Sequence, residues 1–483
     1  MMSSVLSVRD FKSAENLIYF LDGAKTMVER AKKRGYPPPT RGKALIQMKE
    51  ASSRTGGSFE EAAAKIGLRT REIQGKDHTS LRKGESPYDD IITHANQEMD
   101  VYVTRTKVEG ESRYLAEILQ ENGHKVPVIN GGDGEHDHVT QMLLDWYTIR
   151  QKMGRIDNFT IGFCGDLTFG RTVHSNVQAV KLLTNVKVVL CSFGGLKLPE
   201  HLKKDLNIVD EVDGDLSPLC KCDVIYATRI QKERIILPID FSLIEKSYVI
   251  NRDFLDRCKK NVLLMHPQPV VFEIGADIRN DSRLIMDEQA WNGLPMRMFI
   301  LDNAIKNYQP LDLEIASEDL EEDKRTIRAE EAKKRGKYFN PVEKGTVIDH
   351  LKAGSAHYIE TLLGQLGVDI SQPILTAKNM PSDTCSSGEK DVILLHDQCI
   401  KGKAAGVLRL ISPGVTINIL EGDGLMHKLK FRPPHNIKGV FKCPNPMCIT
   451  NIDRYAKSWF EIQDGDILCH YDERTFNISN LRS

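Results

Sequence analysis

Short apolar runs alternate with amphipathic helical segments through roughly the first 300 residues, and this alternation most constrains the fold. Helical periodicity fills many of the gaps between the runs, as at 58–66 and 172–183. Strands that alternate with helices in this way form parallel sheets with helices on both faces. We therefore expect an α/β fold, with buried strands at 44–48, 101–104, 126–129, 159–164, 186–190, 223–227 and 262–265.

Changes in character along the chain divide it into five parts. A long amphipathic segment at 138–152 is expected to join two α/β halves. The stretch 311–337 is dense in charge, which predicts a solvated helix or linker rather than a binding tail. After Pro341 we expect a separate α+β module, with a helix at 358–366 and strands at 392–395, 405–411 and 415–420. The predicted parts are 1–145, 146–308, a charged linker at 309–340, 341–436 and a small terminal module at 437–483.

The charge balance argues against any partner that is recognised by overall charge. Lys and Arg total 66 and Asp and Glu total 67, which gives a net charge of −1. Neither nucleic acid nor a membrane is therefore an expected partner. The chain has no apolar run near the ~18 residues that span a bilayer, and its polar N-terminus is unlike a signal peptide. Most of the ten cysteines lie scattered in apolar or ordinary surroundings, which suits a reducing compartment, so we expect a cytoplasmic protein.

The first chemical motif, Ser52-Ser53-Arg54-Thr55, lies between a predicted strand and a predicted helix. A helix N-terminus offers free N–H groups and a positive dipole end, and these side chains add hydroxyls and a guanidinium. Taken alone, the motif is more often a cluster that caps a helix. However, polar motifs also follow other predicted strands, where open α/β sheets bind ligands, and the joint pattern indicates an anion site. These motifs are 79–85, Arg105, 138–141, 165–172, 228–234 and 266–269.

Residues 1 to about 305 resemble the catalytic chain of aspartate carbamoyltransferase, through motifs in matching order and spacing. The signature around Arg54 is shared with ornithine carbamoyltransferases, whereas Arg229-x-Gln231 is typical of the aspartate branch. The resemblance implies two doubly wound parallel-sheet catalytic domains. It also implies that carbamoyl phosphate and L-aspartate give N-carbamoyl-L-aspartate and phosphate, in de novo pyrimidine (UMP) biosynthesis. No metal or organic cofactor is expected for this chemistry.

The resemblance also implies a role for each site residue. Thr55, Arg105 and His138 would face the carbonyl oxygen, and Gln141 would accept from the carbamoyl amide. Backbone carbonyls at Pro267 and Gln268, in the segment that ends at Pro269, would help Gln141. Lys83, in a loop with Ser80, would reach the aspartate site of a neighbouring subunit, which implies a homotrimer or a dimer of trimers. The phosphate would be held by Ser52, Ser53, Arg54, Thr55 and Arg105, and the aspartate by Lys83, Arg171, Arg229 and Gln231.

Ordinary structural roles compete with these assignments when each residue is taken alone. His138 at a helix start fits a capping or core histidine, and Lys83 in a polar loop fits a solvated lysine. Arg171 stands at a predicted helix N-terminus, where the dipole disfavours a cation. A bound anion would resolve that conflict, so Arg171 favours the functional interpretation.

Several positions depart from the family pattern. Gly56 stands where the family has a second arginine, and Gln268 and Val270 alter its His-Pro-Leu-Pro-Arg segment. The loop before Lys83 is one residue shorter, and Ser53 keeps the hydroxyl of a threonine. The primary ligands are all present, so we retain the enzyme interpretation. The alternatives are a carbamoyltransferase with a different amine acceptor and a non-catalytic scaffold or regulatory paralogue.

The sequence after the linker resembles the regulatory chain of the same enzyme, beginning at 344–350. The resemblance implies a nucleotide-binding α+β domain, and a bridging module without nucleotide control is the alternative. A lysine that the family uses aligns with Leu394. The positions that correspond to nucleotide contacts are Asp349, His350, Asn418 and Lys428.

The last residues carry the pattern Cys443-x4-Cys448, twenty residues, then Cys469-x2-Asp472. Two paired knuckles of this kind bring four ligands to one tetrahedral zinc. The family has cysteine at the fourth place, where this chain has Asp472, and three reduced core cysteines without metal are the alternative. We expect one structural zinc per chain, in a module that contacts the catalytic domain of a neighbouring chain.

Overall fold

The computed structural model describes residues 2–32, 40–75, 83–235, 240–313, 320–328, 344–371, 374–383, 385, 387–422, 425–463 and 465–478. The chain divides into two compact units, each described here by itself. The first unit comprises Met1–Asp312 with Met447–Arg454, and the second comprises Leu313–Pro446 with Tyr455–Ser483. Within the described residues, every helix is too short or too polar to cross a membrane.

The first sheet of the first unit has the strand order β2-β1-β3-β4, and all of its strand pairs are parallel. Its carboxyl-terminal edge therefore gathers the residues that follow β1, β3 and β4. The N-terminal Val5 pairs with Ile129 of the edge strand β4. The elements are β1 (Gly42–Met48), α2 (Ser53–Ile66), β2 (Leu68–Gln74), α3 (Pro87–Ala95), β3 (Val101–Thr106), α4 (Glu111–Glu121) and β4 (Val128–Asp133).

The second sheet is also wholly parallel, in the order β7-β6-β5-β8-β9. The strand order changes direction at β5, so the residues after β5 and β8 lie at a topological switch point. The elements are β5 (Thr160–Gly165), α6 (Arg171–Val180), β6 (Lys187–Ser192), α7 (Glu200–Lys203), β7 (Ile208–Asp213), β8 (Val224–Ala227), α8 (Phe241–Ser247), α9 (Arg252–Leu255) and β9 (Leu263–Met265).

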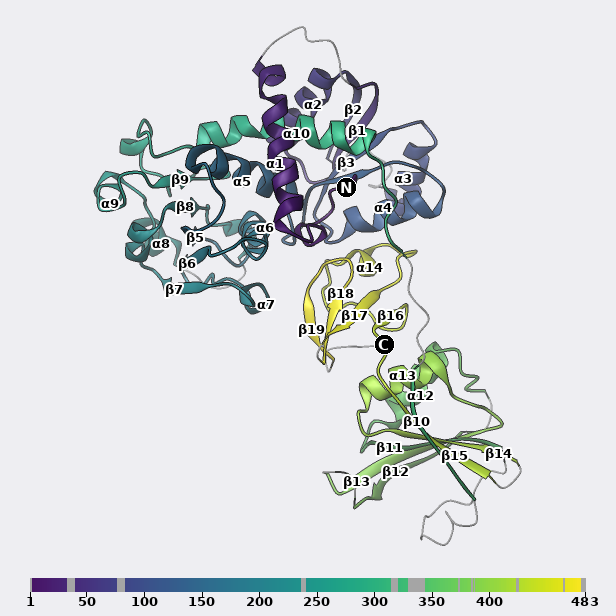
Figure 1. The fold of residues 1–483 in the computed structure, drawn as a ribbon. Helices are drawn as coiled ribbons and strands as arrows, with labels where there is room; N and C mark the ends of the chain where they lie inside the picture. Colours follow the sequence, from purple (N-terminus) through teal and green to yellow (C-terminus); the bar gives the residue numbers. More distant parts are fainter. Residues whose placement is uncertain are drawn as a thin grey trace. The chain divides into compact units, whose positions relative to one another are not determined.

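Three long helices join the two sheets into one body: α1 (Ala14–Lys32), α5 (Val139–Met153) and α10 (Met286–Lys306). In Figure 1, α10 crosses beside α1 and continues toward α5, and α10 contacts both helices. One apolar core runs without a break from Ile46 in the first sheet to Phe163 in the second, and Trp146 is fully buried within it. The prediction of two parallel α/β domains is therefore confirmed.

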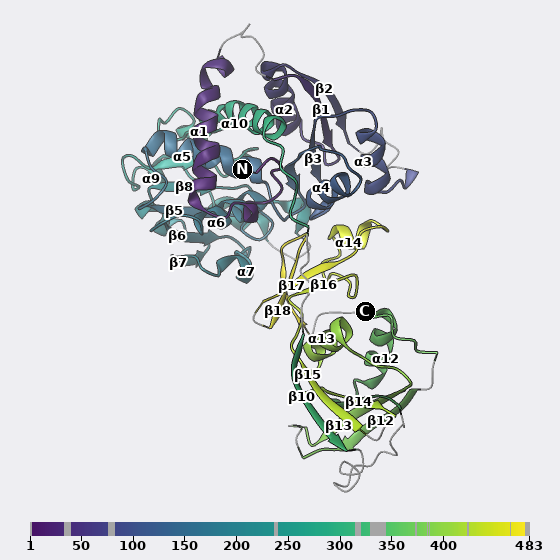
Figure 2. The same ribbon diagram turned by 45° about the vertical axis from the view of Figure 1, so that its right-hand side comes forward.

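The second unit contains two antiparallel sheets. The six-stranded sheet has the order β10-β15-β14-β11-β13-β12, and α12 and α13 lie on one face of it (Figure 2). The smaller sheet has the order β16-β17-β18-β19. The elements are β10 (Glu321–Arg328), β11 (Lys344–Lys352), α12 (Ala356–Gln365), β12 (Ile374–Pro381), β13 (Glu389–His396), α13 (Gly402–Ile411), β14 (Thr416–Glu421), β15 (Leu425–Phe431), β16 (Asn436–Lys438), β17 (Trp459–Gln463), β18 (Asp466–Cys469) and β19 (Thr475–Asn477), with α14 (Ile449–Ile452) in the first unit.

Two predictions for this unit are wrong. The segment 405–411 is helical rather than a strand, because its apolar residues bury one face of α13, with Ala405, Val407 and Leu408 in the core. Part of the predicted linker is also structured, since Glu321–Arg328 forms β10 and pairs with β15. Residues 314–319 and 329–340 of the predicted linker lie outside the described part of the chain.

Candidate active site

The turn from β1 into α2 forms the first wall of the candidate site. Ser52 is the N-cap of α2, and its hydroxyl accepts from the backbone N–H of Thr55 at 3.4 Å. The capping interpretation is therefore correct for Ser52, and Ser53 and Arg54 are left exposed at the free N–H groups of the helix. Burial and the positive charge of Arg229 both lower the pKa of Arg54. The helix start thus presents an arginine that lies in the field of a second arginine.

Glu50, which the sequence analysis did not single out, joins three arginines from both sheets. Its carboxylate lies 2.8 Å from an Arg171 nitrogen, 3.2 Å from Arg105 Nε and 3.6 Å from Arg234. Burial opposes ionisation of Glu50, but Arg171 and Arg105 outweigh it and lower the pKa. Together with Arg54 and Arg229, these residues form a strongly cationic cluster, which suits ligands that carry several negative charges.

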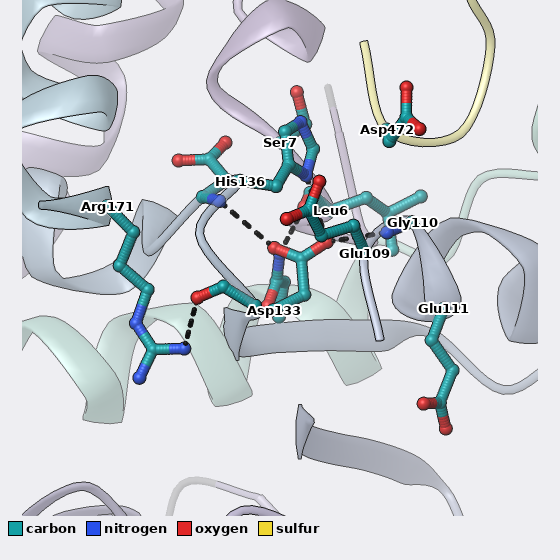
Figure 3. Close-up of polar contacts among 12 residues, drawn as sticks. Leu6, Ser7, Glu109, Gly110, Glu111, Asp133, His136, Arg171 and Asp472 are labelled. Carbon is teal, nitrogen blue, oxygen red and sulfur yellow. Dashed lines mark hydrogen bonds and ion pairs between the residues drawn. The ribbon is translucent and has the colours of Figure 1, made fainter. Parts of the chain in front are cut away.

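Arg171 begins α6, as expected, but a protein carboxylate offsets the unfavourable dipole there. Besides its ion pair with Glu50, Arg171 donates to the carbonyl of Gly134 at 3.0 Å. Figure 3 shows Arg171 and, near it, the side chain of Asp133, the residue directly before Gly134. The Asp133 carboxylate accepts from Gly110 N at 2.8 Å and contacts His136 Nδ1 at 2.9 Å. The position of Arg171 therefore depends on a loop held between β4 and α4.

His138 and Arg105 face each other at the same sheet edge. The distance from an Arg105 terminal nitrogen to His138 Nε2 is 3.3 Å. Because a guanidinium only donates, Nε2 accepts in this arrangement and the ring proton lies on Nδ1. Burial and the charge of Arg105 hold the pKa of His138 well below its usual value, so the ring is neutral. A neutral imidazole among arginines is suited to hydrogen bonding rather than to carrying charge.

Gln141 lies in the first turn of α5, and its amide nitrogen donates to the buried Asp145 at 2.9 Å. The segment after β9 supplies a facing wall, in which Gln268 has a φ of 58° and precedes a cis peptide bond to Pro269. Gln268 and Pro269 share one cleft with Arg54, so the structure brings the β1–α2 turn and the 266–269 segment together. The cleft is lined by Arg54, Gln268, Pro269, Val270, Ile274, Gly275, Ala276, Arg279 and Met286.

Arg229 and Gln231 follow β8, at the switch point. Glu233 pairs with both terminal nitrogens of Arg229, one of them at 3.1 Å, and this hydrogen-bonded pairing raises the pKa of Arg229. Gln231 lies against Asp166, whose carboxylate accepts from its backbone N–H at 3.3 Å. Glu233 and Asp166 were also missed, because single carboxylates beside strand ends carry no distinctive spacing.

Lys83 is exposed, and within the described residues no hydrogen bond or ion pair joins it to the arginine cluster. Ser80 lies outside the described residues. The assignment of Lys83 to the site therefore remains a prediction.

The four predicted nucleotide contacts lie on neighbouring strands of the six-stranded sheet. Val347 in β11 pairs with Asn418 in β14, and Asn418 pairs with Lys428 in β15. Residues opposite each other share one face, so Asp349, two positions after Val347, lies on that face as well. Lys390 Nζ lies 2.7 Å from the Asp349 carboxylate, which is also 3.3 Å from His350 Nδ1.

The C-terminal ligand set is assembled as its spacing predicts. One donor atom from each of four buried residues lies within 4.8 Å of the others, and the four are Cys443, Cys448, Cys469 and Asp472. Asp472 also accepts from Asn445 Nδ2 at 2.9 Å, which orients its carboxylate. Three thiols and a carboxylate are the donor types that zinc prefers, so the residues present fit a tetrahedral metal ion.

The segment Met447–Arg454 belongs to the first unit and contacts its α/β part. The expected contact of the C-terminal module with a neighbouring chain stays a prediction. Glu109 N donates to the carbonyl of Met447 at 2.9 Å, and Ile449 N donates to the carbonyl of Glu109 at 3.0 Å. Tyr88 N also donates to the Asp453 carboxylate at 3.0 Å. Glu109 directly precedes Gly110, whose backbone N–H donates to the Asp133 carboxylate. The segment Met447–Arg454 therefore pairs with the backbone next to the loop that holds Arg171.

Four family models match this chain in order. Residues 3–151 match "Aspartate/ornithine carbamoyltransferase, carbamoyl-P binding domain" and residues 157–303 match the corresponding "Asp/Orn binding domain". Residues 338–432 and 435–482 match the allosteric and metal binding domains of "Aspartate carbamoyltransferase regulatory chain".

Individual relatives agree with these models. The chain is 37% identical over 311 residues to the aspartate carbamoyltransferase catalytic subunit of Methanobrevibacter smithii, covering 63% of this chain and 96% of the relative. The solved catalytic subunit of Methanocaldococcus jannaschii aspartate transcarbamoylase is 36% identical, with a TM-score of 0.58, and the match covers 63% of this chain and 99% of that one. A Trypanosoma cruzi aspartate transcarbamoylase, solved in complex with carbamoyl phosphate, is 27% identical, with a TM-score of 0.55 over 62% and 94% of the two chains.

Proposed function

The chain belongs to the aspartate/ornithine carbamoyltransferase family, with the two regulatory-chain domains in the same polypeptide, and we propose that it transfers the carbamoyl group of carbamoyl phosphate to L-aspartate. The observation that carries the proposal is the cluster of Arg105, Arg171 and Arg234 around Glu50, beside Arg54 and Arg229. Carbamoyl phosphate and aspartate together bring a phosphate and two carboxylates, and such a cluster offsets that charge. The four domains of this proposal are carbamoyl phosphate binding (1–145), aspartate binding (146–308), regulatory (341–436) and metal binding (437–483). The segment 309–340 connects the second domain to the third, and its residues Glu321–Arg328 add strand β10 to the six-stranded sheet.

The phosphate site in this proposal is the start of α2. Ser52, Ser53 and Thr55 offer hydroxyls, while Arg54 and Arg105 supply charge next to the free N–H groups of the helix. Phosphate is the leaving group, so charge grows on its oxygens as the C–O bond breaks. Fixed cationic donors that need no reorganisation stabilise that change.

The carbamoyl group lies between the start of α5 and the 266–269 segment. Arg105, Thr55 and His138 face its carbonyl oxygen, which becomes negative as the aspartate amine attacks. The amide of the carbamoyl group is a hydrogen-bond donor. Its acceptors are the side-chain oxygen of Gln141 and the backbone carbonyls of Pro267 and Gln268, the two residues before Pro269. Binding both substrates in one cleft removes most of the entropy cost of their encounter.

Aspartate is held from the other sheet by Arg171, Arg229 and Gln231, with Lys83 supplied by a neighbouring chain.

The test of the proposed function is an acceptor panel, in which phosphate release from carbamoyl phosphate is followed with aspartate, ornithine and other amino acids. We expect that aspartate is the acceptor in the panel that supports phosphate release, and that ornithine and the other amino acids do not. Turnover with ornithine instead would assign a different acceptor, and binding of carbamoyl phosphate without turnover would support a scaffold.

Lys83 is expected to act in trans, in the site of a neighbouring chain of the same homotrimer. In this proposal the assembly is that homotrimer or a dimer of such trimers. Lys83→Ala and Arg54→Ala chains, each nearly inactive alone, are mixed after mild dissociation. Random reassembly gives about a quarter of the sites an intact Arg54 from one chain and an intact Lys83 from the next. Recovery of activity in the mixture is the expected result. Absence of recovery, with mixed trimers confirmed by mass spectrometry, would place Lys83 in its own chain's site or outside any site.

The metal in this proposal is a structural zinc held by Cys443, Cys448, Cys469 and Asp472. We expect about one zinc per purified chain, because a module this small has little core of its own. Asp472→Cys is expected to hold zinc at least as tightly and Asp472→Ala to lose it, measured by competition with a chelator. Release is expected to unfold the C-terminal module or to dissociate larger assemblies. Fully assembled protein without metal by elemental analysis would refute the site.

The sheet face that carries Asp349, Asn418 and Lys428 is the proposed site of a nucleotide effector, with His350 at its edge. The carboxylate and amide suit a base and ribose, and the lysine suits phosphate. Lys390, which pairs with Asp349, supplies a cation on β13, the strand on which Leu394 replaces the family lysine. A cytoplasmic enzyme of pyrimidine biosynthesis fits this combination of domains.

A further inference from the structure

Asp145 is a fully buried carboxylate at the centre of the first unit. Its Oδ1 accepts from Gln141 Nε2 at 2.9 Å and from Gln289 Nε2 at 2.7 Å. Its Oδ2 accepts from Asn176 Nδ2 at 2.9 Å and from Tyr226 OH at 2.7 Å. Four donors from four different elements therefore converge on one side chain.

This arrangement fixes how the Gln141 amide is turned. A carboxylate only accepts, so the Gln141 nitrogen must face Asp145 and its oxygen must face away. Burial raises the pKa of Asp145 to about 6, so the group is mainly ionised at neutral pH and keeps its acceptor role. Gln141 is only half-buried, and its oxygen is the end left for a ligand.

Asp145 also fixes the orientation of the Gln289 amide, which connects it to the 266–269 segment. Its nitrogen faces Asp145, so its oxygen points the other way, and it accepts from His266 N at 3.0 Å. His266 Nδ1 in turn lies 2.9 Å from Gln268 N, and His266 Nε2 lies 2.9 Å from Glu273. The start of the 266–269 segment is thus tied to Asp145 by an uninterrupted chain of hydrogen bonds.

We propose that Asp145 is a positioning residue for substrate specificity, which aims the Gln141 oxygen and the carbonyls of Pro267 and Gln268 at one donor amide of the substrate. The inference rests on the proposed function, because the donor amide is that of carbamoyl phosphate. Both acceptors are set before the substrate arrives. An acyl phosphate with a methyl group in place of the amide leaves them unpaired, and a site built to receive an N–H rejects such an analogue strongly.

The test compares carbamoyl phosphate with acetyl phosphate, which differs from it only in that group. In Asp145→Asn, the new amide nitrogen competes with the glutamine nitrogens and allows Gln141 to turn. We expect kcat/KM for carbamoyl phosphate to fall about 10- to 100-fold, while the Kd of acetyl phosphate, measured by calorimetry, changes about threefold or less. The preference for carbamoyl phosphate over acetyl phosphate should therefore fall at least about threefold.

Tyr226→Phe is the matched control. It removes a donor from Oδ2 of the same carboxylate but leaves both glutamines on Oδ1, so the preference should be retained. If Asp145→Asn does not fold, Gln289→Met removes the hydrogen bonds of Gln289 to Asp145 and to His266 N but leaves Gln141 on Asp145, and a loss of preference of about threefold or more is expected. The Kd of inorganic phosphate reports that the rest of the site is intact.

The outcomes separate the two levels of inference. A wild-type protein that binds carbamoyl and acetyl phosphate equally would refute the proposed role of Gln141. If the wild type discriminates and Asp145→Asn retains the full preference, or weakens both ligands equally, Asp145 has only a structural role and the inference is overturned.

Discussion

Arg54→Ala is expected to lower kcat for carbamoyl transfer by about 10²- to 10³-fold, with a smaller effect on the KM for aspartate. Arg54 is exposed at the start of α2, next to the free N–H groups on which the leaving phosphate would lie. An interaction that strengthens as phosphate departs acts mainly on kcat. Steady-state kinetics with both substrates varied measures the effect.

Arg41→Ala is the control, because it removes an exposed arginine of the same α/β half away from the cluster. Its kcat should equal that of the wild type. An Arg54→Ala protein with near wild-type kcat would remove the phosphate site from the start of α2.

Arg229→Ala is expected to lower kcat/KM for aspartate by about ten- to a hundredfold, because a charge-assisted hydrogen bond to a carboxylate is lost. The binding of carbamoyl phosphate should change little, since Arg229 follows β8 in the second sheet. Its guanidinium is already pre-positioned by Glu233, so the aspartate carboxylate meets an ordered group.

The exposed Arg257 is the matched control in the same half, and Arg257→Ala should leave the aspartate profile unchanged. Equilibrium binding of carbamoyl phosphate to Arg229→Ala checks that the other site is intact. An unchanged aspartate profile in Arg229→Ala would contradict the assignment of the acceptor site.

Much of the fold could be predicted because the α/β part obeys simple periodicity. Runs such as 159–164 and 186–190 are buried on both faces, and they are β5 and β6 in the structure. The strands that were missed carry little apolar signal. β2 and β7 are edge strands, and β7 is exposed at Asp210 and Glu211.

Local pattern fails where tertiary pairing decides the outcome. Glu321–Arg328 has the composition of a solvated linker, yet its backbone completes the edge of a sheet by pairing with β15. The segment 405–411 has an apolar run that fits either a strand or a helix, and a short run cannot separate the two.

The site residues divide in the same way, into those that local sequence motifs predict and those that only contacts across the fold reveal. Arg105, Arg171 and Arg229 could be predicted because each stands at the end of a strand or the start of a helix, within a recognisable motif. Glu50 and Asp145 could not, because their importance lies in what they contact across the fold. Glu50 joins arginines from two sheets, and Asp145 joins Gln141 on α5 to Gln289 on α10.

The central claim is that this single chain makes a new bond between the carbamoyl carbon and the amine of aspartate. The direct measurement is carbon-13 NMR of carbamoyl phosphate labelled at the carbonyl, incubated with the purified full-length protein and L-aspartate. We predict that the label appears in N-carbamoyl-L-aspartate with one phosphate released per product, and that Arg54→Ala protein forms the product far more slowly. Label that remains in carbamoyl phosphate or its spontaneous breakdown products, with protein shown to be folded and assembled, would contradict the account.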